Sequence, residues 1–488
     1  MTTTISRPDP GAAVPTAAER SGRRIPVWLA VLAASVPIFI ATLDNLVMTN
    51  ALPVIRLDFG SSVEELQWFV NSYTLVFASF ILMATALGDR FGRRRLFLAG
   101  IVIFTVASAF SALSTESWML IVGRAFQGLG GAAIMPLSLT LLAGSVSARL
   151  RPLAIGIWGG ISGLGVALGP LIGGAVVEGW NWQAIFWINV PIGILSIPLV
   201  LIALPNTFGA RVRADVVGLV LVGVGVLGVV YGIVRGNDAG WSSLEVVTSL
   251  ALGAVLLVAF VVWERRTPAP LLPLRLFRDR SFAVSNLVGL VFSFGMFGSI
   301  FILIQFLQVV QGYSPLGAGV ATMPWTLAPM VIAPLAGLIA PRVGTRALIV
   351  AGLVFQATGI FWLAATMSAD VEYLELLPAF ILAGIGMGLV FAPISTAVLA
   401  TLSGDDHAKA SGSSSTLREI GVALGIAVLT AVFVSAGGEL TPNAYVAAAV
   451  PAIFVGAGAL ALAALISLAL PAGRSQRLSE GAPASPVE

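Results

Sequence analysis

The chain of 488 residues contains no cysteine, one histidine and one lysine. Without cysteine it forms neither disulfides nor thiolate metal sites. The histidine, His407, stands in a polar stretch beside Asp405 and Asp406, a spacing that matches no metal-ligand pattern. The lysine, Lys409, does not follow the spaced glycines that a phosphate-binding loop requires. We therefore expect no metal, no cofactor, no nucleotide and no enzymatic activity, and an ion gradient as the source of energy.

Charge is also scarce, because charged residues make up 10% of the chain and hydrophobic residues 58%. A soluble domain carries about 25% charged residues. A helix needs roughly 20 apolar residues to cross about 30 Å of hydrocarbon, and such segments recur along nearly the whole chain. Fourteen are predicted, at about 27–52, 65–87, 96–114, 118–143, 153–178, 184–204, 215–235, 245–263, 282–311, 315–340, 347–367, 376–401, 415–436 and 445–470. The expected fold class is therefore an all-α membrane protein embedded in the lipid bilayer.

The basic residues predict how these segments are oriented. If the N-terminus is cytoplasmic and the fourteen segments alternate, the inner loops hold nearly all of the 26 Lys and Arg residues, including Lys409 and Arg418. Only Arg56 and Arg235 fall on the outer side, and Arg124 lies inside a helix. This asymmetry satisfies the positive-inside rule, and it explains the net charge of +3 without a nucleic-acid partner. It predicts a multi-pass protein of the cell membrane, plasma or inner, with both termini in the cytoplasm.

Two stretches of the chain share the five residues GVALG, at 165–169 and again at 421–425. The first copy continues with Pro170, whereas the second continues with Ile426. Two further landmarks, a basic loop and a glycine–proline pair in a later helix, recur at nearly the same separation. Chance similarity between apolar segments would not produce one common offset. The sequence therefore predicts an internal duplication, and two parallel halves of this kind usually place a substrate cavity at their interface.

The duplication divides the chain into five predicted regions. An N-terminal half of six helices spans 27–205, and a C-terminal half of six helices spans 281–470. Between them, 206–280 contains two inserted helices and a cytoplasmic linker. The flanking segments 1–26 and 471–488 are predicted cytoplasmic tails, the first of them disordered. The inserted helices carry few polar residues, so we expect them at the periphery, facing lipid.

Two charges of opposite sign are predicted deep inside the membrane. Asp44 lies roughly 12 Å from the outer end of the first helix, and Arg124 roughly 9 Å from that of the fourth, at about 1.5 Å per residue. Ionisable groups in a bilayer are costly and are usually paired or functional. Burial favours the neutral acid, whereas a close guanidinium favours the carboxylate. A switch between these environments would carry a proton, and a permanent structural pair is the alternative.

The basic loop between the second and third helices reads GDRFGRRR, and a copy that has lost its acid to Pro341 recurs before Arg342. Its glycines permit a tight turn. Asp89 can cap a helix or pair with an arginine. The loop is either a conformational latch between helices or a simple topogenic segment. The candidate latch residues are Asp89, Arg90, Gly92, Arg93 and Arg94.

The fifth helix combines glycines at four-residue spacing with a proline. Such spacing gives a flat face for close helix approach, and Pro170 removes a backbone hydrogen bond and kinks the helix. Packing alone explains the glycines but leaves the proline unexplained, so a hinge is predicted. The residues concerned are Gly165, Gly169, Pro170, Gly173 and Gly174.

Several neutral polar side chains lie in the predicted helices. They either line a substrate cavity or bond neighbouring helices, and the sequence does not separate these roles. The many phenylalanines and methionines suit an adaptable apolar pocket and equally suit ordinary packing. The candidate cavity residues are Asn71, Gln127, Gln305, Gln308 and Gln356.

Together these residues resemble the major facilitator superfamily, and more narrowly its drug:proton antiporter branch with fourteen transmembrane helices. The resemblance covers about residues 27–470. The loop signature matches at the five latch residues, although Thr85 replaces its first glycine. The fifth-helix signature matches at all five positions named above. The helix-four signature matches at Arg124, Gln127, Gly128 and Gly130, and the helix-one signature at Asp44, Asn50, Ala51, Leu52 and Pro53.

The resemblance implies alternating access, in which proton entry is exchanged for exit of a small drug-like substrate. It implies proton transfer by Asp44 and Arg124 and a closure role for the fifth helix. The predicted function is proton-coupled efflux of hydrophobic or cationic drugs or antibiotics by a monomer. A dedicated exporter of one endogenous metabolite is the alternative. A membrane enzyme is disfavoured because no nucleophile and base are paired, and uptake symport is disfavoured by the Gly-Pro helix.

Overall fold

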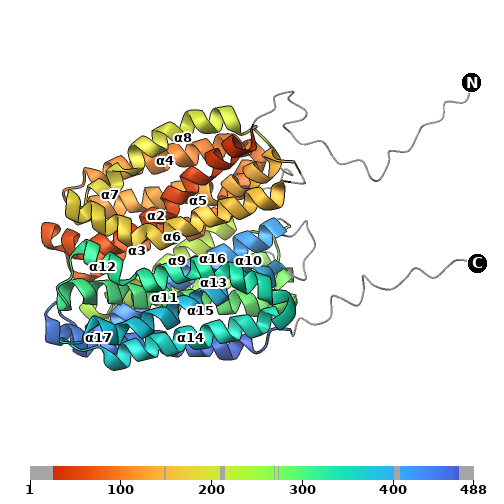
Figure 1. Cartoon of the computed structure of the whole chain (residues 1–488). Coiled ribbons are helices and arrows are strands. Elements are labelled where there is room, and N and C mark those ends of the chain that lie inside the picture. The colour runs from red at the N-terminus through yellow and green to blue at the C-terminus, as the bar shows by residue number, and fades with distance from the viewer. Residues whose placement is uncertain are drawn as a thin grey trace, which may run out of the picture.

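The computed structural model describes residues 26–147, 150–208, 215–268, 270–272, 274–399 and 407–471. Within these residues every regular element is a helix, which confirms the predicted all-α class. Figure 1 shows the helices running side by side in two bundles, with both chain ends leaving from the same side. The predicted tails lie almost entirely outside the described residues, as do Asp405 and Asp406.

The first bundle consists of helices that reverse direction at short turns. Gly60 adopts a left-handed conformation that ends the first helix, and Ser62 and Glu65 form a capping box that begins the next, as helix-end chemistry requires. Its elements are α2 Val27–Phe59, α3 Val63–Phe91, α4 Arg93–Ala112, α5 Ser117–Ser145, α6 Arg151–Gly179, α7 Ala184–Trp187 and α8 Asn189–Ala203.

The second bundle begins after an inserted helix pair, α9 Val216–Ala239 and α10 Leu244–Glu264. It comprises the 3-10 turn η1 Leu274–Arg278, α11 Arg280–Gln305, the π-helical turn η2 Phe306–Val310, α12 Pro315–Ala321, α13 Met323–Val343, α14 Thr345–Thr366, α15 Tyr373–Leu399, α16 His407–Ser435 and α17 Pro442–Ser467. We call the end of the molecule that holds Val27 and Ser467 the terminal face. The opposite end, which holds Phe59 and Pro442, is the far face.

Twelve helices among the described residues are long and apolar enough to cross a membrane, and the bent helix α3 makes a thirteenth. The predicted segment 153–178 lies within α6, a continuous helix of 29 residues. Each of the fourteen predicted segments thus falls on helical structure. Three of them, 184–204, 282–311 and 315–340, each cover two consecutive helical elements. The chain is a multi-pass membrane protein, and the count of fourteen spans stays a prediction.

The duplicated motifs have matching local structures. Gly92 between α3 and α4 has φ 108°, and Gly344 between α13 and α14 has φ 93°, a conformation that favours glycine. In the GVALG copies, a Cβ on Gly165 would lie 2.8 Å from the Phe39 carbonyl oxygen of α2, and one on Gly421 would lie 2.3 Å from the Leu290 carbonyl oxygen of α11. Each copy therefore packs its helix tightly against the first helix of its own half.

The inserted pair lies beside the junction of the two bundles. Helix α9 packs against α3 of the first bundle and α16 of the second, where Val226 and Val230 meet Leu75 and Ala423. Helix α10 packs mainly on α9 and leaves Val255 and Val258 exposed. Helix α10 therefore has the peripheral position that was expected for the pair. Helix α9, in contrast, contacts both halves.

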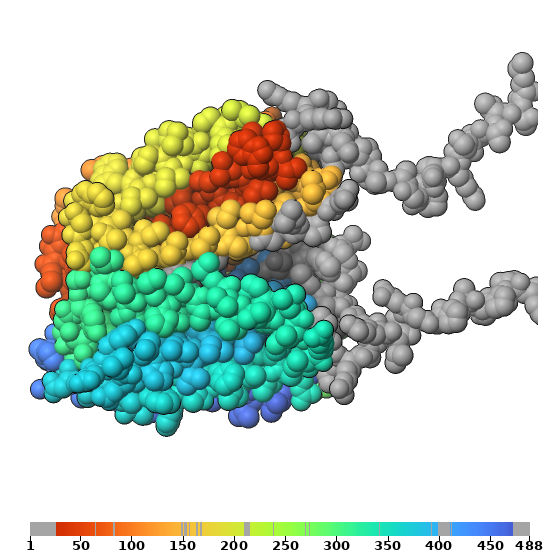
Figure 2. All heavy atoms as spheres, in the orientation of Figure 1, coloured from red at the N-terminus to blue at the C-terminus, as the bar shows by residue number. Residues whose placement is uncertain are grey.

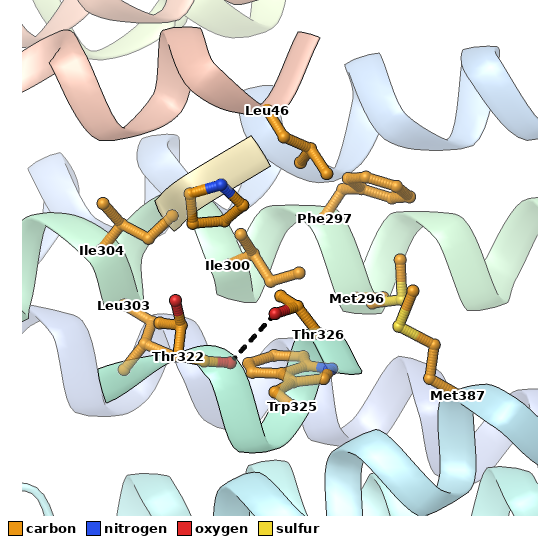
Figure 3. Close-up of a pocket in the computed structure, with 11 residues that line it drawn as sticks. Leu46, Met296, Phe297, Ile300, Leu303, Ile304, Thr322, Trp325, Thr326 and Met387 are labelled. Atoms are coloured by element: carbon orange, nitrogen blue, oxygen red, sulfur yellow. Dashed lines mark hydrogen bonds between the residues drawn. The ribbon is translucent and has the colours of Figure 1, made fainter. Parts of the chain in front are cut away.

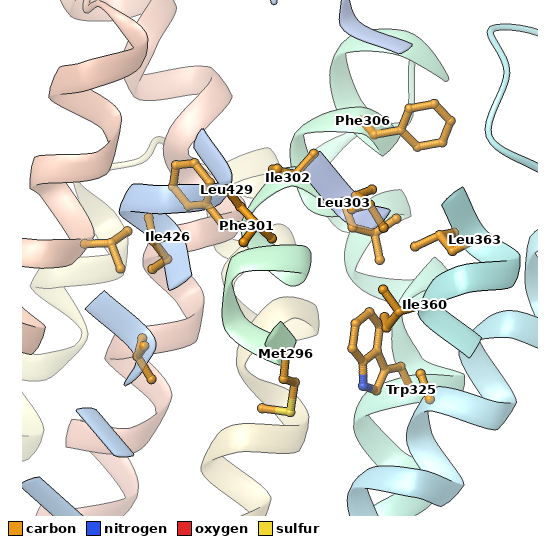
Figure 4. Packing of buried hydrophobic residues seen from close by; sticks show 14 of the residues in the cluster. Met296, Phe301, Ile302, Leu303, Phe306, Trp325, Ile360, Leu363, Ile426 and Leu429 are labelled. Atoms are coloured by element: carbon orange, nitrogen blue, oxygen red, sulfur yellow. The ribbon is translucent and has the colours of Figure 1, made fainter. Parts of the chain in front are cut away.

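Apolar side chains fill the bundle interiors and also cover much of the outside. Figure 4 shows buried residues of the second bundle interlocking between helices, among them Phe301 of α11, Trp325 of α13, Ile360 of α14 and Leu429 of α16. On the outer surface, side chains such as Leu465 remain exposed. An apolar exterior of this extent is stable only against lipid, since water would leave the surface unfavourably hydrated.

The helix that carries Arg418 begins earlier than predicted. It was expected at 415–436, with Arg418 near its inner end, but α16 begins at His407 and continues unbroken past Arg418 to Ser435. The polar residues between Ser411 and Thr416 look like a loop in sequence, yet their backbone groups are satisfied within the helix. Arg418 and its neighbour Glu419 thus lie inside the segment 412–435 that is apolar enough to span.

Candidate functional site

A buried polar cluster lies inside the first bundle, centred on the carboxylate of Asp44. Asp44 of α2 is 4% exposed and Arg124 of α5 is fully buried. A terminal guanidinium nitrogen (Nη1) of Arg124 donates a hydrogen bond to Asp44 Oδ2, which makes the two an ion pair. The similar depths estimated from the sequence placed these side chains at the same level, and the helix packing brings them into contact.

Two side-chain amides donate further hydrogen bonds to this carboxylate. Gln127 Nε2 donates to Asp44 Oδ1 at 3.1 Å, and Asn189 Nδ2 of α8 donates to the same oxygen at 2.7 Å. Both amides also donate to Ser108 Oγ of α4, at 2.8 and 3.3 Å. Asp44 therefore accepts hydrogen bonds from side chains of two other helices, α5 and α8. The bond from Arg124 is charge-assisted, the strongest kind.

Arg124 is fixed by further contacts. Its Nε donates to the Phe69 carbonyl oxygen at 3.1 Å, and its guanidinium carbon lies 4.5 Å from the centre of the Tyr73 ring. A cation over an aromatic face is stabilised electrostatically. Its second terminal nitrogen (Nη2) is buried without a hydrogen-bond partner in the described part of the chain, so both of its N–H donors are unused.

The glycines of α6 make the close contacts expected of them. A Cβ on Gly169 would lie 2.7 Å from Leu46 Cβ, and one on Gly173 would lie 3.0 Å from Val47 Cα, so both glycines face α2. Gly174 faces the other bundle, because a Cβ there would lie 2.3 Å from the Pro315 carbonyl oxygen of α12. The motif therefore joins α6 to its own half through one face and to the opposite half through Gly174.

Asn50 reinforces this contact between the halves. Its Nδ2 donates to the carbonyl oxygens of Pro170 and Pro315, each at 2.8 Å. Gln308 Nε2 in turn donates to the Asn50 carbonyl and side-chain oxygens, each at 2.9 Å. Asn50 is fully buried. One amide thus connects α2, α6 and the start of α12, close to the far face.

A small apolar cavity lies next to this contact, on the side toward the terminal face. The second bundle supplies most of its lining, including Met296, Phe297 and Trp325, and the first bundle supplies Leu46 and Pro170. Figure 3 shows these side chains pointing into one space between the two bundles. Figure 2 shows the bundles in contact along the far side and a hollow between them nearer the terminal face. The cavity lies at the seam that the duplication predicts.

The basic loop joins α4 to the end of α8 within the first bundle. Arg93 Nε donates to Asp89 Oδ1 at 2.7 Å, and the Arg93 amide donates to the Thr207 carbonyl at 2.9 Å. Arg94 donates to the Leu204 carbonyl at 3.0 Å. Arg90 lies against the Phe91 ring, and a Cβ on Gly92 would collide with Asn206. In this state the candidate latch holds elements of one half together.

Comparison with known proteins identifies the family. The sequence model of the Major Facilitator Superfamily matches residues 34–425 and 287–488. The chain belongs to the Major Facilitator Superfamily. It is 35% identical over 406 residues to the multidrug resistance protein Stp of Mycobacterium tuberculosis, covering 83% of this chain and 75% of that protein. Relatives named for drug resistance and export place it in the drug-efflux branch of the superfamily.

A second relative and a solved structure support the same assignment. The chain is 32% identical to the tetracenomycin C resistance and export protein of Streptomyces glaucescens, covering 89% of this chain and 81% of that protein. The crystal structure of a peptide transporter of the POT family, in complex with sulfate, resembles it with a TM-score of 0.66 at 16% identity. That likeness covers 90% of this chain and 94% of the transporter, and it shows the fold alone.

In this member of the superfamily, the five candidate cavity residues occupy separate places. Gln127 belongs to the Asp44 cluster and Gln308 to the Asn50 contact. Gln305 donates to the Phe301 carbonyl one turn earlier in its own helix. Asn71 and Gln356 are fully buried, without a hydrogen-bond partner in the described part of the chain. The cavity in Figure 3 is lined by other side chains, mostly apolar.

Sequence reasoning missed two residues of this transporter. Asn189 donates a hydrogen bond to Asp44. In the sequence it is a single polar residue within the apolar stretch WINVPIG, so no pattern of polar residues indicated its role. Glu419 lies inside a spanning segment, half-buried, and close enough to Tyr73 to interact electrostatically. It forms no hydrogen bond and no ion pair with any described residue. An intramembrane acid is the signal that would have found it.

The Gly174 contact predicts a conformational effect of substitution. In Gly174→Val, the new Cβ would meet backbone atoms of Pro315 and Leu316, which cannot move aside separately, so the far-face contact opens. Because the chain has no cysteine, a single Leu171→Cys reporter at this contact can be labelled with a membrane-impermeant maleimide. We expect labelling to rise about tenfold, as for a shift of about 1.4 kcal/mol in the conformational equilibrium.

The matched control is Gly179→Val on the same helix. Nothing lies within 4 Å of a Cβ at Gly179, so its labelling should equal that of the reporter alone. Equal labelling in the Gly174 and Gly179 variants would show that the Gly174 contact does not hold the halves together.

Proposed function

We propose that this chain is a secondary active transporter that exports hydrophobic or cationic compounds across the cell membrane in exchange for protons. Its membership of a transporter family supports solute transport and not catalysis. Relatives named for multidrug resistance and antibiotic export support this class of substrate. The basic loops at the terminal face, which include Arg93 and Arg94, support a cytoplasmic position for that face.

The single observation that carries the proposal is the buried Asp44–Arg124 pair. A carboxylate enclosed by helices can exchange a proton only if its surroundings change during transport. In the present conformation Arg124 and two amides donate to the Asp44 carboxyl group. When the first bundle shifts and Arg124 withdraws, burial favours protonation of the carboxylate. Asp44 would then take up a proton in one conformation and release it in the other.

Helix α2 links this proton site to the substrate site. Leu46, two residues after Asp44, lines the cavity, and Asn50 holds the contact between the halves. A compound that enters the cavity contacts α2, the same helix that carries the proton acceptor. Opening of the far face breaks the hydrogen bonds between Asn50 and the second bundle, those with Pro315 and Gln308. Movement of α2 therefore couples substrate binding, proton exchange and closure of the far face.

The test uses purified protein in proteoliposomes with an imposed pH gradient and a trapped pH indicator. Adding a transported compound, such as tetraphenylphosphonium or ethidium, should move protons in the direction opposite to the compound. Liposomes without protein, and liposomes whose gradient has been collapsed by an ionophore, provide the controls. Transport of compounds without any proton movement would reject antiport, and transport of no compound would reject drug export.

Glu419 supplies the charge for the cationic part of the proposal. Asp44 is neutralised by Arg124, whereas Glu419 forms no hydrogen bond or ion pair among the described residues, although its neighbour Arg418 attracts it electrostatically. In Glu419→Gln, we expect export of tetraphenylphosphonium to fall about tenfold, because a partly desolvated charge pair contributes at least about 1.4 kcal/mol. Export of a neutral compound should be unchanged.

Glu116→Gln is the matched control for an acid of the outer loops. Glu116 is exposed near the far face, where water screens its charge. Its substitution should leave both rates unchanged. If the Glu116 variant loses cation export and the Glu419 variant keeps it, recognition takes place at the outer loops and not between the bundles.

A further inference from the structure

Two acidic side chains meet at the base of the inserted helix pair, next to the terminal face. Asp215 directly precedes α9, and Glu264 is the last residue of α10. They are 8% and 4% exposed, and their carboxyl groups interact directly. A Cβ at Gly218 would lie 2.6 Å from Asp215 Oδ2 and 2.8 Å from Glu264 Oε1. Both oxygens therefore lie over a residue that has no side chain.

The two carboxyl groups differ in the donors that reach them. Asp215 Oδ1 accepts from the Gly218 amide at 2.8 Å, and the Trp263 indole nitrogen (Nε1) donates to both Asp215 oxygens, at 2.8 and 3.0 Å. Asp215 also caps the N-terminus of α9, where negative charge is stabilised. Glu264 Oε2 accepts from the Leu272 amide at 3.0 Å, whereas its Oε1 is buried without a hydrogen-bond partner among the described residues.

No described cation lies against this pair to balance two negative charges. Asp89 of α3 is bonded to Arg93, and Glu419 of α16 is attracted by Arg418. The remaining arginines near this end of α3 and in the linker between α10 and α11 are exposed, namely Arg90, Arg265, Arg266, Arg275 and Arg278. Among the described charged groups, the one that interacts with Glu264 is Asp215.

We propose that Asp215 and Glu264 bind one proton between them, and that this proton fastens the linker to the inserted helix pair. Two buried carboxylates that face each other repel strongly, and such pairs share a proton. Asp215 has more donors and keeps the negative charge. Glu264 Oε1, to which no described group donates, carries the proton and donates it to Asp215 Oδ2. A charge-assisted hydrogen bond thus replaces the repulsion.

The proton site is connected to the linker through Glu264 itself. Its second carboxyl oxygen accepts from the Leu272 amide, and the adjacent Leu271 is buried with Leu219 of α9 and Met83 of α3. The linker leads through η1 to α11 of the second bundle. Loss of the proton restores the repulsion and releases the linker. The proton comes from the cytoplasm, which rests on the orientation proposed above for the terminal face.

The experiment places a single Leu271→Cys reporter in the cysteine-free chain and follows its maleimide labelling in nanodiscs. The same reporter in Glu264→Gln is the reference at each pH, because glutamine cannot ionise and its amide can donate to Asp215. Thiol chemistry is common to both proteins. The two labelling rates should be equal at about pH 5.5. At about pH 8.5 the reporter with Glu264 should react about tenfold faster, as for a shift of about 1.4 kcal/mol.

Three further variants test the geometry of the pair with this reporter. Asp215→Asn replaces the repelling charge by an amide, so the alkaline rise should disappear. Gly218→Ala places a methyl group against both oxygens, so labelling should be fast at every pH. Glu245→Gln alters an exposed acid at the other end of α10, and it should keep the alkaline rise unchanged.

Infrared spectra of the protein without the reporter detect the proton directly. The difference between the two pH values should contain a band of a protonated carboxyl C=O. That band should be missing in Glu264→Gln and present in Glu245→Gln.

Three outcomes would overturn the proposal. They are a labelling ratio that does not change with pH, an alkaline rise that persists in Asp215→Asn, and an infrared band that persists in Glu264→Gln. The second outcome would assign the effect to burial of Glu264 alone and not to proton sharing. Neither readout requires transport, so failure of the antiport test and failure of this site are distinguishable.

Discussion

Asp44→Asn should abolish uphill export driven by a proton gradient. Asparagine keeps the size of the side chain but cannot bind and release a proton, so we expect the coupled rate to fall on the order of a hundredfold, as for loss of a positioned proton-transfer group. Exchange of substrate at equal concentrations on both sides, which needs no net proton transfer, should persist. The two rates are measured with the same compound in the same proteoliposomes.

The single substitution also leaves Arg124 buried without its counter-ion. Removing one partner of a buried pair costs about 3–5 kcal/mol, which lowers the yield of folded protein. The double variant Asp44→Asn with Arg124→Gln restores neutrality and should recover the thermal stability. It should not recover uphill export. Uphill export in the double variant would make the pair a structural element and not the proton carrier.

The position of the Asp44 carboxyl group is also fixed, because Asn189 donates to it at 2.7 Å and so acts as a positioning residue in the proton site. Asp44→Glu retains a carboxyl group, in contrast to Asp44→Asn, but moves it by one methylene. This variant should therefore retain part of the coupling that Asp44→Asn loses.

Pro170→Ile should leave the protein inserted in the membrane and reduce export about tenfold or more. The equivalent position in the second half is Ile426, which is buried and well packed, so isoleucine is compatible with this place in the fold. Isoleucine restores the backbone N–H that proline lacks and removes the clash of the proline ring with the preceding turn, so the local course of the helix changes. The Pro170 carbonyl then moves away from Asn50 and Gly319, which it now contacts.

Pro198→Ile is the control for this substitution. Pro198 also lies inside a helix, α8, but it is exposed on the outer surface. Its replacement should affect neither insertion nor export. The amount of protein in the membrane and its initial export rate are measured for both variants. Full export by the Pro170 variant would remove the kinked helix from the mechanism.

The sequence predicted those features of this protein that depend on one helix at a time. Long apolar segments fall on helices because a span must satisfy its backbone groups internally. The GVALG repeat occupies equivalent places in both halves because duplicated helices keep their nearest neighbour. The depths of Asp44 and Arg124 followed from counting residues along each helix. Family membership rests on these same motifs.

The role of each polar side chain depended on contacts between helices far apart in the chain. Gln127 and Gln308 looked equivalent in sequence, but one bonds Asp44 and the other bonds Asn50. The polar stretch before Arg418 looked like a loop in sequence, but it lies within α16. A helical segment of small polar residues has the same composition as a loop, so composition alone does not distinguish them.

The sequence by itself therefore determined the all-helical membrane class, the duplication and the family of this protein. Only the tertiary structure decided that Asn189 completes the Asp44 cluster and that Gly174 meets the opposite half. The physical reason is that hydrophobicity and helix periodicity are local properties of the chain. Whether a buried polar group finds a partner is decided by the packing of other helices around it.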